Sequence, residues 1–130
     1  MANMVFRRLG TTQLVAHGRK NPTEAEWGEF VAASRAATPA IDGVLVFTAG
    51  GTLNAAQRAE VEKLFGRVRI SVLTDSVVAR GVVTALGWFG VPIRAFPPGD
   101  PEAAMNHLRV TGPRRAELAS ALNELKAQVT

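Results

Sequence analysis

Segments with the length and patterning of β-strands alternate along the chain with segments of helical periodicity. The predicted strands cover residues 4–9, 12–17, 43–48, 68–73 and 92–96. The first two are joined only by Gly10 and Thr11, and so short a link is typical of an antiparallel hairpin. Residues Val44 to Phe47 are apolar without interruption, which predicts a central strand covered on both faces.

Helices are predicted between and after these strands, over residues 24–37, 55–65, 76–89, 101–108 and 113–129. Thr23 and Glu26 form a capping box before the first helix, and Asn54 is placed to cap the second. This order predicts an α/β fold: a mainly parallel sheet, opened by the antiparallel hairpin, with helices packed on it. We expect one domain over residues 1–130, in which residues 113–130 form a C-terminal helical extension.

Two of the predicted helices carry unusual apolar patterns. Apolar side chains cover most of the circumference of the helix at 76–89, namely Val77, Val78, Val82, Val83, Leu86, Trp88 and Phe89. A helix of this kind is buried deeply or meets a partner. The last helix has a narrow apolar seam, formed by Leu118, Leu122, Leu125 and Val129. Such a seam docks onto a sheet or onto another chain, so either helix is a candidate for self-association.

The composition narrows the class of protein. The chain has 130 residues, of which 47% are hydrophobic, and this content excludes intrinsic disorder. It has no Cys, which excludes a disulfide scaffold and thiol catalysis. The longest apolar stretch, residues 82–93, is too short and too interrupted to span a bilayer, and residues 1–20 lack the pattern of a signal peptide. We therefore expect a soluble, cytoplasmic protein without a transmembrane segment.

The formal net charge of +4 is confined to one end of the sequence. Residues 1–20 contain Arg7, Arg8, Arg19 and Lys20 and no acidic residue, whereas basic and acidic residues balance over the rest of the chain. The surplus belongs to the hairpin region, so it marks one edge of the predicted sheet, where an acidic partner would bind. The remaining arginines are scattered rather than striped, so we do not expect nucleic-acid binding.

Few residues are candidates for catalysis or for ligand binding. The loop after the predicted central strand contains Gly50, Gly51, Thr52 and Asn54. Ligands of open α/β sheets collect at such loops, although no phosphate-binding motif is present. Asp75 and Ser76 form a second loop at the same edge, and helix capping explains both. His17 and His107 lie on different elements without further ligands around them, so we expect no metal site, no catalytic residue and no cofactor.

Several stretches carry a resemblance to a known family, namely the hairpin 4–17, the strand 43–48, Val72–Arg80 running into Leu86–Phe89, and Ile93–Phe96 followed by Asp100–Ala104. Over residues 4–109 they resemble a STAS domain, the fold of anti-sigma-factor antagonists and of sulfate-transporter tails, and more loosely its SEC14-like relatives. The resemblance implies a non-enzymatic regulatory or scaffold module that binds a protein partner.

One loop departs from the family pattern. In the antagonists, the loop after the central strand carries Asp-Ser-Ser-Gly, whose serine is phosphorylated by a partner kinase. The matching stretch here, residues 50–54, has neither Ser nor Asp, so Thr52 is the only hydroxyl there that could serve as a phosphosite. Asp75 and Ser76 mimic that phosphosite, but they follow the next strand.

Three functions are compatible with these observations. We favour a protein-interaction module that binds an unidentified partner, or a second copy of itself, through residues 49–54 and the helices at 55–65 and 76–89. The alternative is a site for a small ligand, such as a nucleotide or a lipid, at the strand ends near Gly50 and Ser76. The third is a hydrolase that uses Ser76 and His107.

Overall fold

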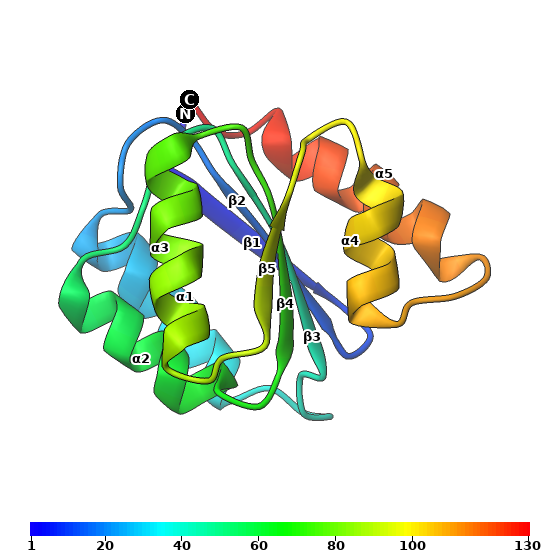
Figure 1. Cartoon of the computed structure of the whole chain (residues 1–130), viewed down its shortest axis with the longest axis horizontal. Coiled ribbons are helices and arrows are strands. Elements are labelled where there is room, and N and C mark those ends of the chain that lie inside the picture. Colours follow the sequence, from blue (N-terminus) through cyan, green and yellow to red (C-terminus); the bar gives the residue numbers. More distant parts are fainter.

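The chain folds around one five-stranded sheet, described over residues 1–130 by a computed structural model (Figure 1). The strands, in their order across the sheet, are β1 (Met4–Leu9), β2 (Thr12–His17), β3 (Gly43–Thr48), β4 (Arg69–Leu73) and β5 (Ile93–Phe96). β1 pairs with β2 in antiparallel orientation, and all other neighbours pair in parallel. The predicted α/β fold is confirmed, with β3 at the centre of the sheet.

Helices cover both faces of the sheet. They are α1 (Glu24–Arg35), α2 (Ala55–Phe65), α3 (Val77–Trp88), α4 (Pro101–Leu108) and α5 (Arg114–Lys126). Figure 1 shows α1, α2 and α3 on one face and α4 and α5 on the other. Successive parallel strands are always added on the same side, so right-handed crossovers place the three connecting helices in one layer.

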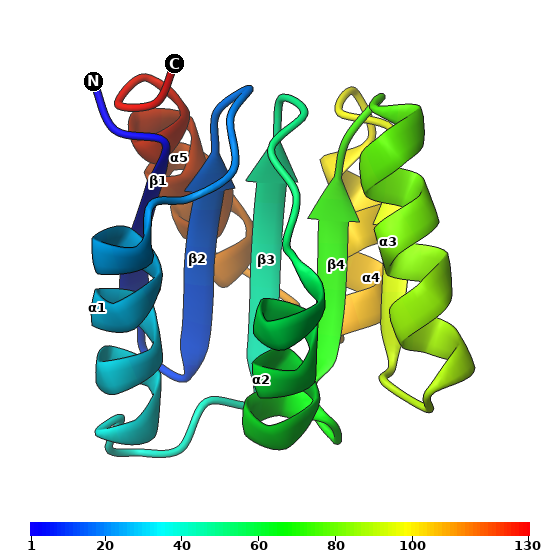
Figure 2. The ribbon, with the colours of Figure 1, turned by 90° about the vertical axis from the view of Figure 1, so that its left-hand side faces the viewer.

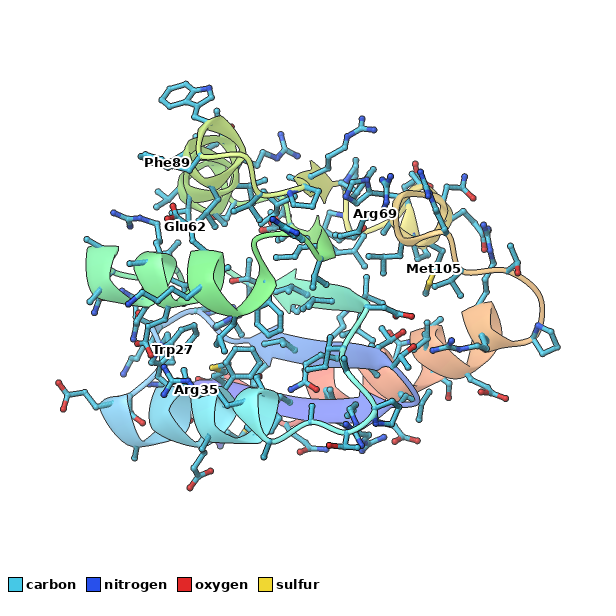
Figure 3. All side chains as sticks on the ribbon, turned by 90° about the horizontal axis from the view of Figure 1, so that it is seen from below. Trp27, Arg35, Glu62, Arg69, Phe89 and Met105 are labelled. Atoms are coloured by element: carbon cyan, nitrogen blue, oxygen red, sulfur yellow. The ribbon has the colours of Figure 1, made fainter.

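The alternation of side chains along the strands divides the apolar core into two parts. In β2, Leu14 packs in the core beneath α4 and α5, whereas its neighbour Val15 packs in the core beneath α1, α2 and α3. Figure 3 shows one large member of each part, Met105 from α4 and Trp27 from α1, on opposite sides of the sheet. Each central strand is therefore covered on both faces.

The apolar seam of the last helix packs on the sheet. Leu118, Leu122 and Leu125 are buried in the same core as Leu14. The chain then returns to its own beginning, because Val129 forms a parallel bridge with Ala2, and the two termini lie side by side (Figure 1). The sequence left open whether this helix docks onto the sheet or onto another chain, and it docks onto the sheet.

Three helices are shorter than the sequence predicts. α1 ends at Arg35 rather than at Ala37, because Thr38 precedes a proline and such a position disfavours helical backbone. α3 begins after Ser76 and ends before Phe89, which act as its caps. α5 stops at Lys126, because the following residues turn toward the N-terminus.

Basic residues of the hairpin region take two different positions. Arg7 and Arg8 lie on the edge strand β1, where Arg7 pairs with Glu124 at 2.7 Å and Arg8 donates to the carbonyl oxygen of Thr38 at 2.8 Å. Arg19 and Lys20 follow β2 and are exposed. The charge surplus is thus divided between the sheet edge and the loop beyond β2.

Candidate functional site

The loops predicted to carry function lie together at the carboxyl ends of β3 and β4. Residues 49–54 connect β3 to α2, and residues 74–76 connect β4 to α3 (Figure 2). The two strands are parallel neighbours, so their following loops share one edge of the sheet.

The backbone N–H groups of Gly50, Gly51 and Thr52 are each hydrogen-bonded within the protein. Gly50 donates to the hydroxyl oxygen of Thr48 at 3.1 Å, and Gly51 donates to the carbonyl oxygen of Gly18 at 2.8 Å. Thr52 donates through its backbone N–H to Oδ1 of Asn21 at 2.8 Å. A phosphate cradle needs free amides, and these three are not free.

The two polar side chains of this loop have local structural partners. The hydroxyl of Thr52, which is half-buried, donates to the same Oδ1 of Asn21 at 3.2 Å. Asn54 forms a reciprocal capping box with Gln57: each side chain accepts a hydrogen bond from the other residue's backbone N–H, at 2.8 and 2.9 Å. The hydroxyl of Thr52, the predicted phosphosite, thus has a single hydrogen-bond partner, the side chain of Asn21.

The second loop is bound to the first. The hydroxyl of Thr74 donates to the carbonyl oxygen of Thr48 at 2.9 Å and accepts from the backbone N–H of Ser76 at 3.1 Å. Ser76 caps α3, because its hydroxyl accepts from the backbone N–H of Ala79 at 3.2 Å. Asp75 is exposed and lies between them. The predicted loop residues thus meet at one edge, where their side chains mainly hold the backbone.

Ser76 and His107 do not meet. Ser76 follows the carboxyl end of β4, whereas Nε2 of His107, on α4, lies 3.0 Å from the carbonyl oxygen of Pro92, just before β5 begins. Because β4 and β5 are parallel, these positions are at opposite ends of the sheet. The arrangement brings no imidazole to the serine.

A small apolar cavity lies beneath the glycine loop, between the sheet and the layer of α1, α2 and α3. Its volume is about 90 Å³, and its walls are mainly core side chains such as Trp27, Phe30 and Val83. The polar side chains in its lining, His17, Thr48 and Thr52, come from the carboxyl edge of the sheet. A cavity of this size is smaller than the roughly 300 Å³ at which ligand pockets usually begin.

His17 is buried at this cavity without a hydrogen-bond partner for its Nδ1 atom. Burial lowers the pKa of the imidazole from its ordinary value of 6.5 to about 4, against the opposing charge of Glu26. The pKa of Glu26 is itself lowered: burial raises it, but hydrogen bonds from the backbone N–H groups of Thr23, Met4 and Asn3 outweigh that effect. The cavity is therefore lined by a neutral imidazole at neutral pH.

The outer side of α3 is the most conspicuous exposed surface. Ala79, Val83 and Leu86 are buried against the sheet, but Val77, Val78, Trp88 and Phe89 are 81%, 66%, 81% and 74% exposed. Figure 3 shows Phe89 on the outer side of this helix. We define the α3 face as these four residues together with the two small residues between them, Gly81 and Ala85. The sequence left open whether this helix is buried or meets a partner; it is buried on one side only.

Sequence reasoning missed the residues that hold the two loops together. Thr48 is the last residue of β3 and Thr74 directly follows β4, its parallel neighbour, and both are buried. A threonine at each of two adjacent strand ends is a signal that could have been found. Asn21 carried no such signal, because its contact with Thr52 spans 31 positions of the chain.

Three further observations concern the chain as a whole. No three His, Cys, Asp or Glu side chains lie close enough together to hold a metal ion. None of the helices combines the length and the apolarity required to cross a membrane. Comparisons with protein-family models, with curated proteins and with solved structures gave no match.

Proposed function

We propose that this chain is a non-catalytic regulatory or scaffold module of STAS-like type, which binds a protein partner through the α3 face. One observation carries the proposal: a large apolar surface, with Trp88 and Phe89 both strongly exposed, lies on one side of a single helix. Contiguous exposed apolar patches of this kind mark interaction sites. Aromatic side chains are also the residues most enriched among those that dominate binding energy.

The carboxyl edge of the sheet supports this function by fixing the helix that carries the surface. Ser76 caps α3, and Thr74 connects the start of that helix to the end of β3. The side chains of these loop residues are hydrogen-bonded to backbone groups. They therefore fix the start of α3 in place and leave few polar groups free for catalysis. The STAS-like order of strands and helices is consistent with a module that acts by docking.

The proposal is tested by capture of partners from extracts of the producing cells. Wild-type chain is compared with the double variant Val78→Glu/Phe89→Glu, which places two charges on the α3 face. A matched control, Ala32→Glu/Ala33→Glu, places the same charges on the exposed side of α1. We expect a protein that the wild type and the control retain and the α3 variant releases. If the α3 variant retains every captured protein, the proposed surface is wrong.

A small-ligand site at the strand ends is the second candidate, and the unpartnered His17 at the cavity favours it. The cavity suits a small, mainly apolar molecule with one polar group rather than a nucleotide or a lipid, since its volume is about 90 Å³. A thermal-shift screen with nucleotides, fatty acids and small aromatic alcohols separates these classes. Stabilisation by one class that is lost in His17→Leu would support this function, and a flat screen would contradict it.

A further inference from the structure

The α3 face has larger apolar side chains at its two ends and small ones in its middle, an arrangement that would fit a second copy of itself. Val77 and Val78 lie in the first turn of the helix, and Trp88 and Phe89 lie at its end. Between them, Gly81 and Ala85 are four positions apart and so share one side of the helix. A Cβ atom built on Gly81 would meet nothing within 4 Å, which leaves open space above the middle of the face.

We propose that a second copy of this chain covers the α3 face, with the two α3 helices antiparallel about a two-fold axis; this rests on the proposed function. In such a pair the axis passes near the middle of each helix, so the same patch is used twice. The valine end of one helix then lies against the aromatic end of the other. Gly81 and Ala85 lie at the crossing, where small side chains allow two helices to approach closely.

The exposed area is of the right order for a dimer. Trp88 and Phe89, at 81% and 74% exposure, together offer roughly 350 Å² of ring surface. Val77, Val78 and the helix backbone between them add to this figure. A stable interface buries roughly 800 Å² on each partner. The α3 face thus supplies a large part of that area before any neighbouring element contributes.

No other extended apolar surface competes for this role. Apart from Met1, the strongly exposed large apolar side chains are the four of the α3 face. The leucine seam of α5 is already buried on the sheet. A second copy therefore has one patch on which it can dock, and the pairing closes on itself rather than extending into a fibre.

The charges near α3 allow a second copy to be distinguished from an acidic partner by the effect of salt on binding. Arg80 is the only charged residue within α3, and together with Arg94 it lines the shallow cleft between α3 and β5, outside the α3 face. Two copies paired through α3 bring like charges closer together, so salt should leave their association unchanged or strengthen it. An acidic partner held by Arg80 and Arg94 would instead be released by salt.

The first test measures the mass of the purified chain by sedimentation from low micromolar to millimolar concentration, at low and high salt. We expect a monomer–dimer equilibrium that salt does not weaken. Gly81→Leu should raise the dissociation constant by at least about tenfold, because it fills the crossing. The same substitution at Gly28, on the exposed side of α1, also meets no atom within 4 Å and should leave the dimer intact. Non-specific apolar association would increase in Gly81→Leu, which contradicts the proposal.

The second test uses the absence of cysteine to determine orientation. Val77→Cys and Trp88→Cys chains are prepared separately, mixed and oxidised. The antiparallel pair predicts a disulfide-linked dimer in the mixture and little in either variant alone, because residues 77 and 88 face each other only across the axis. The antiparallel dimer contains two pairs of facing residues 77 and 88. In the mixed dimer one pair carries the two cysteines, and the other keeps the native valine and tryptophan. Cross-linking of Val77→Cys with itself, to the same extent as in the mixture, would overturn the antiparallel arrangement.

The outcomes also separate this inference from the proposed function. A chain that is monomeric at every concentration, but loses a cellular partner in the Val78→Glu/Phe89→Glu variant, overturns the second copy as occupant and keeps the α3 face as an interaction surface. A monomer whose captured partners do not depend on α3 overturns both. Circular dichroism of Gly81→Leu establishes that loss of the dimer is not loss of the fold.

Discussion

The hydroxyl of Thr74 donates a hydrogen bond to the carbonyl oxygen of Thr48 at 2.9 Å, and both side chains are buried. This contact joins the ends of two neighbouring parallel strands at the point where both leave the sheet. Thr48 in turn donates to the carbonyl oxygen of Gly51 at 2.7 Å. The two loops are therefore parts of one hydrogen-bonded unit, which begins at the sheet and ends at the start of α3.

Replacement of Thr74 by valine should lower the free energy of unfolding by about 1–3 kcal/mol. The change keeps the shape of the side chain but leaves the backbone groups of Thr48 and Ser76 without these partners. Urea unfolding followed by circular dichroism measures the effect. The exposed Thr111→Val is the matched control and should stay within about 0.5 kcal/mol of the wild type. Equal stability of Thr74→Val and the control would mean that the contact has no energetic role.

Gly51 should not tolerate a side chain. A Cβ atom there would lie 2.4 Å from the carbonyl oxygen of Lys20 and 3.0 Å from that of Gly18, and both are backbone atoms that cannot rotate away. We expect Gly51→Ala to lower the free energy of unfolding by about 1–3 kcal/mol. Gly28→Ala, in the middle of α1, should raise it by about 0.5–1 kcal/mol because alanine favours helix. Thermal unfolding of the two variants checks the opposite signs.

The elements of this fold could be predicted because their signals are local. Val44 to Phe47 form an uninterrupted apolar run, and it became the central strand. Thr23 and Asn54 each stand three residues before a Glu or Gln, and both capping boxes form. Right-handed crossovers then restrict the arrangement of parallel strands. Composition, periodicity and these few caps were sufficient for the class of fold.

For the candidate site, the sequence predicted where the loops lie but not which residues bind them. The loops with Gly50 and Ser76 were expected at one edge, and they lie there, but their polar partners come from distant residues such as Asn21. The exposure of Trp88 and Phe89 also could not be predicted from the sequence. When apolar residues surround a helix, periodicity does not reveal which side faces the sheet. That information depends on the space left by neighbouring helices.

Leu118→Ala tests the position of α5 on the sheet. Leu118 is fully buried, so its truncation should leave a cavity and lower the free energy of unfolding by about 2–5 kcal/mol. Because the leucine seam packs on the chain's own sheet, the variant should keep the oligomeric state of the wild type at temperatures where it is folded. Urea unfolding and sedimentation, made on the same sample, check both statements. A variant that unfolds like the wild type but changes its mass would place the seam between chains instead.

Acid should destabilise the protein through His17. The pKa of this imidazole is about 4 in the folded chain, below its ordinary value of 6.5, so the unfolded chain takes up the proton first as the pH falls. Stability is therefore complete above pH 6.5 and declines as the pH falls toward 4; between pH 7 and 5 the loss should be about 2 kcal/mol. The lowered pKa of Glu26 acts in the same direction but only below its ordinary value of 4.5, which separates the two groups. Urea unfolding at a series of pH values should give a flat profile between pH 7 and 5 for His17→Leu, whereas His107→Gln, which leaves His17 in place, should keep the decline.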